Sequence, residues 1–179
     1  MRILVATDGS PQSEAAVADV ASRPWPAGTE FEVLAVIHSP IPPLPSPAFV
    51  LPAAHAEQIQ ELTRRAPEWT RAGAERIRQG VPQARVTTRV REGVPQDVIL
   101  EEAAQWGADR IILGSHGHGP LGRLLLGSVA EAVIRRAPCS VEVIRAKPAN
   151  RQAAVDVRAV SEPEPSARTA SSTVRASRG

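Results

Sequence analysis

Aromatic residues, cysteine and long apolar runs are scarce in this sequence, and each scarcity excludes a class of protein. Aromatic side chains make up 3% of the 179 residues and tyrosine is absent, whereas nucleic-acid surfaces stack bases on aromatics beside a basic stripe. The one cysteine, Cys139, cannot form an internal disulfide and fits a reducing cytoplasm. There is no run of about 18 apolar residues and no apolar signal-peptide segment near the start. We therefore expect a cytoplasmic protein that binds neither membrane nor nucleic acid.

Two common phosphate-binding motifs are also missing. The chain has a single lysine, Lys147, so it contains no G-x-x-x-x-G-K-[S/T] loop. The stretch Gly117-His-Gly-Pro-Leu-Gly122 spells G-x-G-x-x-G. That dinucleotide fingerprint needs a helix that opens within its glycines, and Pro120 interrupts the stretch instead. Neither motif therefore accounts for a nucleotide site in this chain.

Charge is unevenly distributed along the chain. The formal net charge is +2, from 21 basic and 19 acidic residues, and residues 146–179 hold six of the basic and three of the acidic ones. Residues 1–145 are therefore close to neutral. The C-terminal stretch has no aromatic residue and is rich in Ser, Ala, Arg, Pro and Glu, a composition too polar to bury a core. We expect one domain over residues 1–146 and a disordered tail over residues 147–179.

Apolar runs alternate with amphipathic segments over the first 145 residues, which predicts an α/β fold with a parallel sheet covered on both faces. Ser10 followed by Pro11 is typical of a helix start, and Gly107 of a helix end. Pro67 is expected to kink or split the second helix, and a proline-rich loop precedes that helix. The expected strands cover residues 2–7, 31–37, 85–91, 110–113 and 140–145, and the expected helices cover residues 11 onward, 53–79, 95–106 and 128–136.

The most informative pattern is the run Gly114-Ser-His-Gly117, followed after nine residues by Gly127-Ser128. Glycines at the end of a strand can adopt positive φ and let a ligand approach the backbone. A glycine and a hydroxyl residue at a helix start present free N–H groups and the positive end of the helix dipole. Together they predict a phosphate cradle. Two plainer readings stay open: the glycines only turn the chain, and Ser128-Val-Ala-Glu131 is a capping box in which Ser128 caps its helix.

This spacing, G-x2-G-x9-G-[S/T], resembles the signature of the universal stress protein family in its ATP-binding branch. The opening RILVATDGSPQSEAAV is also similar to that family's first strand, acidic turn and helix. The resemblance covers most of residues 1–145 and is poor between about 39 and 55. It implies a five-stranded parallel sheet in the order 3-2-1-4-5, of the Rossmann-like, adenine nucleotide alpha-hydrolase-like type. It also implies a homodimer through the last strand, Val141 to Ile144, although Glu142 within that strand leaves the dimer geometry open.

The same resemblance implies roles for individual residues at the crevice between the first and fourth strands. Asp8 would bind the ribose hydroxyls, and its alternative role is an Asx-turn before the first helix. Val36 would face adenine or belong only to the sheet core, and Arg123 would meet phosphate or solvent. The residues expected at the nucleotide are Ala6, Asp8, Val36, Leu113, Gly114, His116, Gly117, Arg123, Gly127, Ser128 and Val129.

We therefore expect an ATP-binding regulatory protein, with Mg²⁺ arriving on the phosphates. His116 and His118, without a Cys or acidic cluster, do not predict a zinc site. No residue is assigned a catalytic role, because no general base is evident at the γ-phosphate. Two alternatives stay open: a slow ATPase or phosphotransfer enzyme that uses one of these histidines, and a dimeric scaffold that binds no nucleotide.

Overall fold

The computed structural model describes residues 1–38, 53–117 and 126–146, with the side chains of residues 53–56 left out of the description. Residues Met1–Lys147 form one compact unit. The expectations for the proline-rich loop, for Arg123 and His118, and for a disordered tail over residues 147–179 concern residues outside these ranges.

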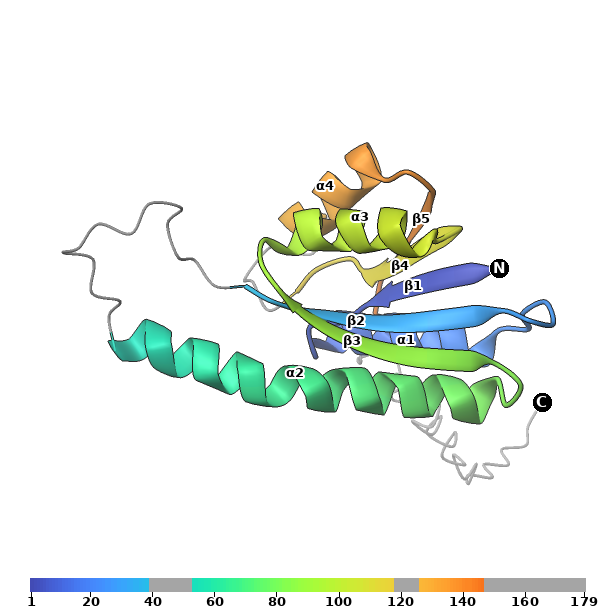
Figure 1. Ribbon diagram of the computed structural model, residues 1–179, viewed down its shortest axis with the longest axis horizontal. Coiled ribbons are helices and arrows are strands. Elements are labelled where there is room, and N and C mark those ends of the chain that lie inside the picture. Colours follow the sequence, from blue (N-terminus) through green and yellow to red (C-terminus); the bar gives the residue numbers. More distant parts are fainter. Residues whose placement is uncertain (39–52, 118–125, 147–179) are drawn as a thin grey trace, which may run out of the picture. The chain divides into compact units, whose positions relative to one another are not determined.

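Five parallel strands form one sheet in the order β3-β2-β1-β4-β5 (Figure 1). The central strand β1 pairs with β2 on one side and β4 on the other, so that Val5 stands beside Val33 and Ile112. This confirms the α/β class and the strand order expected from the sequence. The strands are β1 Arg2–Ala6, β2 Glu30–Ile37, β3 Arg85–Glu92, β4 Arg110–Gly114 and β5 Ser140–Ile144.

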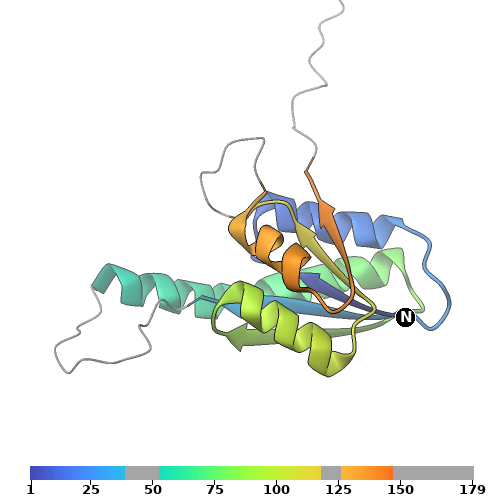
Figure 2. The same ribbon diagram turned by 90° about the horizontal axis from the view of Figure 1, so that it is seen from above.

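Two helices cover each face of the sheet (Figures 1 and 2). The helices α1 (Pro11–Ser22) and α2 (Ala53–Gly80) pack on one face around a core that contains Phe31 and Ile77. The helices α3 (Pro95–Trp106) and α4 (Ser128–Arg136) cover the other face around Leu4, Leu34 and Ile111, among others. Burial on both faces explains why the central strands read as continuous apolar runs.

Local sequence chemistry sets the helix ends much as predicted. The Ser10 hydroxyl caps α1 by accepting the N–H of Ser13 at 3.3 Å, with Pro11 in the first helical position. Gly107 ends α3 in the left-handed conformation at φ 69°, where a side chain would be strained. None of the helices in the described part of the chain is long and apolar enough to cross a membrane.

Of the kink or split expected at Pro67, the split is wrong, because α2 runs from Ala53 to Gly80 through this residue. Proline at this position removes the hydrogen bond to the carbonyl of Thr63. Both Pro67 and Thr63 are exposed, so water can solvate that carbonyl. The apolar packing of α2 on the sheet, through residues such as Ala66 and Ile77, then outweighs the local cost.

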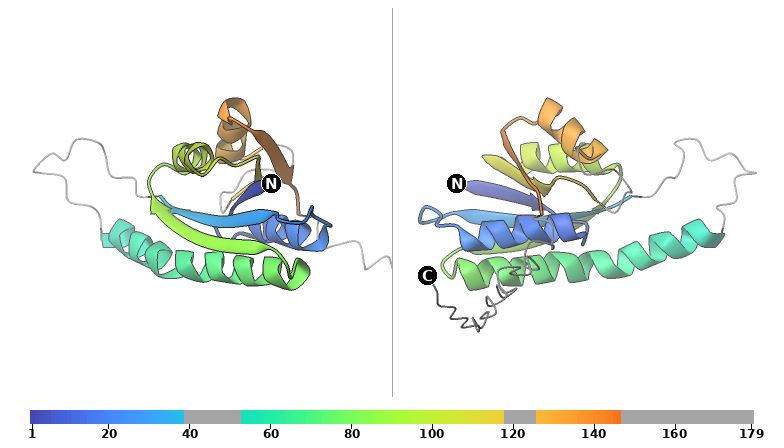
Figure 3. Two further views of the ribbon diagram at one scale, coloured as in Figure 1. Left: turned by 45° about the vertical axis from the view of Figure 1, so that its right-hand side comes forward. Right: turned by 180° about the vertical axis from the view of Figure 1, so that it is seen from behind.

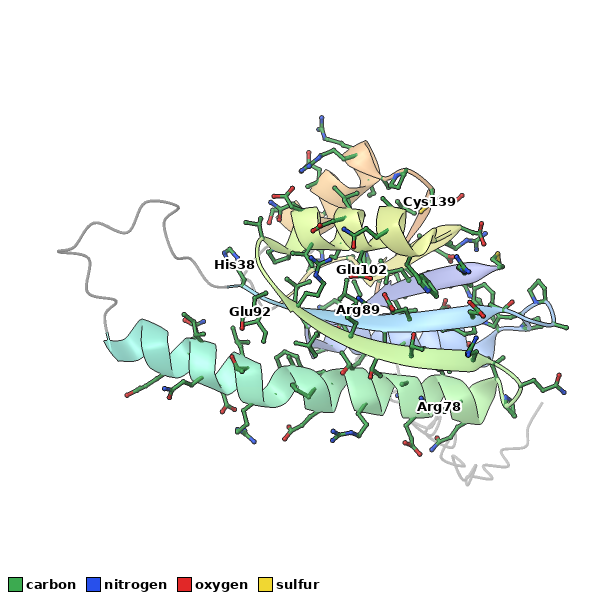
Figure 4. The ribbon with its side chains drawn as sticks, in the orientation of Figure 1. His38, Arg78, Arg89, Glu92, Glu102 and Cys139 are labelled. Carbon is green, nitrogen blue, oxygen red and sulfur yellow. The ribbon has the colours of Figure 1, made fainter. Side chains whose placement is uncertain are left out.

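Two groups of charged residues are paired within the fold, one partly exposed and one with buried carboxylates. Glu142 on β5 hydrogen-bonds to Arg23 at the end of α1 and to Arg110 at 3.3 Å, so its carboxylate has partners within its own chain. The Arg23 guanidinium holds the pKa of Glu142 below its usual range. On the opposite face, Glu32 and Glu102 are almost fully buried beneath Arg89 (Figure 4).

Cys139 is half-buried and packs beside the apolar core under α3 and α4. Burial, with a smaller effect of the Asp109 charge, raises the pKa of its thiol. A thiol with a raised pKa holds little reactive thiolate at neutral pH. This environment suits a packing role for Cys139.

Candidate functional site

A pocket of about 400 Å³ lies where β1, β2 and β4 end. It lies at the point where the strand order reverses, the usual ligand site of open α/β sheets. Of the eleven residues expected at a nucleotide, ten line this one pocket, and Arg123 lies outside the described residues. The ten are Ala6, Asp8, Val36, Leu113, Gly114, His116, Gly117, Gly127, Ser128 and Val129.

Asp8 stands in the turn that joins β1 to α1. Its Oδ1 accepts the N–H of Ser10 at 3.0 Å, which is the Asx-turn that the sequence offered as an alternative role. The other oxygen lies toward the glycine-rich loop, because a Cβ added to Gly117 would come within 2.5 Å of Asp8 Oδ2. Asp8 thus holds the turn and also lines the pocket, so the two roles are compatible.

The glycines of the loop after β4 are required for space and not for a special backbone conformation. The described glycines with positive φ are Gly9, Gly28, Gly93 and Gly107, so the expected positive φ at Gly114 and Gly117 is wrong. A Cβ on Gly114 would lie 2.7 Å from the Gln12 backbone at the start of α1. The absence of side chains lets Gly114 lie against the first turn of α1 and Gly117 against Asp8.

The first turn of α4 presents backbone N–H groups to the pocket. Gly127 is the N-cap residue and makes no side-chain cap, and its own N–H donates to the Ser115 carbonyl at 2.8 Å. The capping-box interpretation of Ser128 is therefore wrong, because Ser128 is already the first helical residue. The N–H groups of Ser128, Val129 and Ala130 have no acceptor within the helix, and all three residues line the pocket.

His116 contributes an imidazole with one unpartnered nitrogen. Its Nδ1 lies 3.0 Å from the Ser115 hydroxyl, while Nε2 is buried and has no hydrogen-bond partner in the described structure. Ser115 is itself buried, and its N–H donates to the Ile144 carbonyl at 2.8 Å. A buried nitrogen without a partner is costly, so a ligand group that pairs with Nε2 would fit this pocket.

Most of the remaining pocket wall is apolar, and several of its residues had no signal in the sequence. Leu34 and Ile99 come from β2 and α3, whereas Leu62 and Trp69 come from α2 on the other side of the sheet. The α2 residues reach the pocket only through tertiary packing, which no local pattern reveals. The other additions are Thr7, Ser13, His38, Pro95, Ser115 and Ala130. His38, at the end of β2 (Figure 4), and Ser115, inside the glycine run, could have been found by their positions.

The described residues contain no group of three or more His, Cys, Asp or Glu side chains placed to hold a metal ion. A cation at this pocket would therefore take its ligands largely from phosphate and water, as Mg²⁺ commonly does. A pocket with an apolar wall, one carboxylate and a helix N-terminus suits an organic anion such as a nucleotide.

Comparisons with known proteins found a matching family and solved structures of similar fold. The family described as Universal stress protein family matches residues 1–145, and no curated protein matches the chain. Among solved structures, the universal stress protein UspA from Lactobacillus plantarum is 26% identical with a TM-score of 0.63, covering 81% of this chain and 97% of its own.

Two other solved structures carry adenine nucleotides. A universal stress protein family protein from Arabidopsis thaliana, with AMP bound, is 16% identical with a TM-score of 0.60, covering 84% of this chain and 97% of its own. A universal stress protein in complex with cAMP is 24% identical with a TM-score of 0.57, covering 80% of this chain and 96% of its own. At these identities the likeness establishes a shared fold.

Proposed function

The chain belongs to the universal stress protein family, and from this premise we propose that it is a regulatory protein that binds ATP at the ends of β1 and β4. The observation that carries the proposal is the pocket itself. It brings ten residues from four separate stretches of the sequence to the carboxyl ends of the strands, where ligands of such folds bind. Chance glycines would not converge with an acidic turn and a helix N-terminus in this way.

The proposed orientation follows from the chemistry of each wall. The α4 N-terminus and His116 suit the phosphates, because backbone N–H groups and the helix dipole favour negative charge. The Asp8 carboxylate suits ribose hydroxyls, which are hydrogen-bond donors. The apolar side of the pocket, with Val36 and Ile99, suits the faces of an adenine ring. AMP and cAMP, the ligands in two relatives, share these three chemical parts with ATP.

The regulatory part of the proposal concerns conformation and assembly. ATP would favour the conformation in which the β1–α1 turn, the glycine loop and the start of α4 enclose the pocket. We further propose a homodimer through β5, which is the last strand in the sheet order. The charge of Glu142 does not oppose this pairing of strands, because its carboxylate accepts hydrogen bonds from Arg23 and Arg110 of its own chain. Partners would then recognise one nucleotide-dependent state of the dimer.

The test is to release and identify nucleotide from the purified protein and to titrate ATP by calorimetry against wild type and Gly117→Val. The variant places a branched side chain against Asp8 Oδ2, and both residues line the pocket. Gly28→Val is the control. Gly28 has positive φ but lies before the start of β2, at the end of the strands away from the pocket. That control carries backbone strain without touching the pocket.

We expect an adenylate in the wild type and in Gly28→Val, and none in Gly117→Val. If the wild type carries no nucleotide and binds none on titration, the proposal fails and the protein is a nucleotide-free scaffold. The same samples, incubated with ATP and analysed by chromatography, measure hydrolysis. Sustained turnover that is lost in His116→Ala would make the protein an ATPase and not only a binding protein.

A further inference from the structure

We propose that Trp69 is a specificity-determining wall that limits the pocket to adenine nucleotides without a bulky substituent on the ribose 2′ or 3′ oxygen. The inference rests on the proposed function, because it uses the placement of ribose at Asp8. It starts from a second cavity, of about 200 Å³, lined by residues of α1 and α2. These two helices lie side by side on one face of the sheet (Figure 3).

The two cavities share lining residues, which form a partition between them. Thr7 and Trp69 line both cavities, whereas Asp8 lines only the larger and Gly9 only the smaller. The β1–α1 turn thus passes between them. Thr7 is short, buried and fixed by hydrogen bonds of its hydroxyl to Ser13 Oγ at 3.2 Å and to the Gly9 N–H at 3.3 Å. The Trp69 indole is therefore the removable part of the partition.

Trp69 is held in this position from several sides. Gly9 has φ +71°, and a Cβ at this residue would overlap the indole ring, so only glycine lets the ring rest on the turn. The Arg65 guanidinium lies 5.3 Å from the ring centroid, a cation–π distance. The ring also packs with Leu62 against the buried Ala66 and its neighbours. A ring so confined sets the size of the space beside Asp8.

A substituent on the ribose would meet this partition. With the ribose hydroxyls at the Asp8 carboxylate, a free hydroxyl fits, but an aromatic ester on the same oxygen would point at the indole. The smaller cavity beyond the indole is lined in part by Val17 and Gly73, with the exposed Arg76. It is too small for a nucleotide and large enough for one ring. Shortening Trp69 would join the two spaces and admit the ester.

The experiment compares three ligands: ATP, 2′-deoxy-ATP and 2′(3′)-O-(N-methylanthraniloyl)-ATP. Their affinities are measured by competition for the wild type, Trp69→Phe, Trp69→Ala and Trp106→Ala, the last being a control because Trp106 lines neither cavity. We expect the wild type to bind the ester at least about tenfold more weakly than ATP, a usual steric discrimination. The ester-to-ATP ratio, which is the dissociation constant of the ester divided by that of ATP, should fall stepwise from Trp69 through Trp69→Phe to Trp69→Ala. The dissociation constant of 2′-deoxy-ATP divided by that of ATP should be the same in the wild type and both Trp69 variants, because this ligand loses a hydroxyl and adds no bulk.

An ester-to-ATP ratio that is the same in the wild type and both Trp69 variants overturns the role of Trp69 and leaves ATP binding intact. A ratio that falls equally in Trp106→Ala also overturns it, since loosening of the whole fold would then be the cause. If no protein binds ATP, the proposed function fails first and the inference fails with it. Should Trp69→Ala not fold, as judged by circular dichroism, Trp69→Phe carries the test alone.

Discussion

The two oxygens of Asp8 have different surroundings, which allows its structural and binding roles to be separated. Oδ1 accepts the Ser10 N–H and Oδ2 lies toward Gly117. Asp8→Asn keeps an oxygen for the turn and removes the negative charge from the pocket. Because hydrogen bonds to charged groups are worth about 1 kcal/mol more than neutral ones, we expect ATP affinity to fall roughly tenfold.

Calorimetric titration measures this loss, with Asp109→Asn as the control. Asp109 precedes the start of β4, at the end of the strands away from the pocket, and its side chain accepts the Arg2 N–H at 2.7 Å. The control should lose stability and keep its affinity for ATP. Equal affinities of wild type and Asp8→Asn would contradict a role for Asp8 in ribose binding.

The buried carboxyl pair of Glu32 and Glu102 makes stability depend on pH. Burial and the Glu102 charge raise the pKa of Glu32, against the opposing effect of Arg89. The folded protein therefore binds this proton more tightly than the unfolded chain, so stability falls as pH rises through the raised pKa. Glu32→Gln removes the charge and retains the shape, and Arg89 still has Glu102 as a partner.

We expect Glu32→Gln to match the wild type near pH 4 and to melt at a higher temperature at pH 8. Thermal unfolding followed at several pH values measures the difference. Glu75→Gln, at an exposed position on α2, controls for the loss of one carboxylate. A wild type that gains stability over Glu32→Gln as pH rises would show that the ion pair with Arg89 dominates instead.

At the scale of elements, α1 and α4 both begin at the pocket but are capped differently. The Ser10 hydroxyl caps α1, whereas α4 starts after Gly127 without a side-chain cap and leaves the Ser128 hydroxyl exposed. Ser10→Ala should therefore cost about 1 kcal/mol of unfolding free energy, the usual value of a cap. Ser128→Ala should change stability by less than about 0.5 kcal/mol.

In ligand binding the order should reverse: Ser128→Ala should lose more ATP affinity than Ser10→Ala. If the Ser128 hydroxyl meets phosphate, its loss lowers ATP affinity several-fold, as expected for about 1 kcal/mol. Urea denaturation and calorimetry together measure both quantities. A Ser128→Ala variant that loses stability and keeps its ATP affinity would restore the capping role that the sequence first indicated.

Sequence patterns predicted the elements well because the determinants of most elements are local. Alternating apolar and amphipathic segments, Ser10 with Pro11, and Gly107 each act within a few residues. The split that was one of two alternatives at Pro67 was wrong, because packing of α2 on the sheet outweighs a local preference. The start of α4 at Ser128 was predicted correctly, but the capping-box alternative for Ser128 was wrong, because Gly127 is the N-cap residue.

For the molecule as a whole, the pocket could be predicted in part. Residues with a local sequence pattern could be predicted, whereas residues brought to the pocket from distant parts of the chain could not. The glycine spacing indicated the loop after β4, and ten of the expected residues do line one pocket. Trp69 and Leu62 could not be predicted, because α2 reaches the pocket from the opposite face of the sheet. Gly9 is explained by its positive φ and by the indole that lies over it, and the second reason joins residues sixty positions apart.

The pocket is lined by residues from both helical layers and from the sheet, so ligand binding should stabilise the whole domain. A nucleotide in the pocket would contact residues of α2 on one face and residues of α3 and α4 on the other, together with the ends of three strands. ATP at a hundred times its dissociation constant should stabilise the folded state by about 2.7 kcal/mol. For a domain of this size, that corresponds to a rise in melting temperature of roughly 5–10 °C.

Differential scanning calorimetry measures the rise, and hydrogen exchange should show protection at Thr7, at Gly117 and at Val129 together. Inorganic triphosphate is the informative control, because it can occupy the helix N-terminus but cannot reach the apolar wall. If triphosphate produces the full rise, the protein binds phosphate alone, and the adenine side of the pocket has another purpose. A rise that requires the whole nucleotide would show that both helical layers take part in holding it.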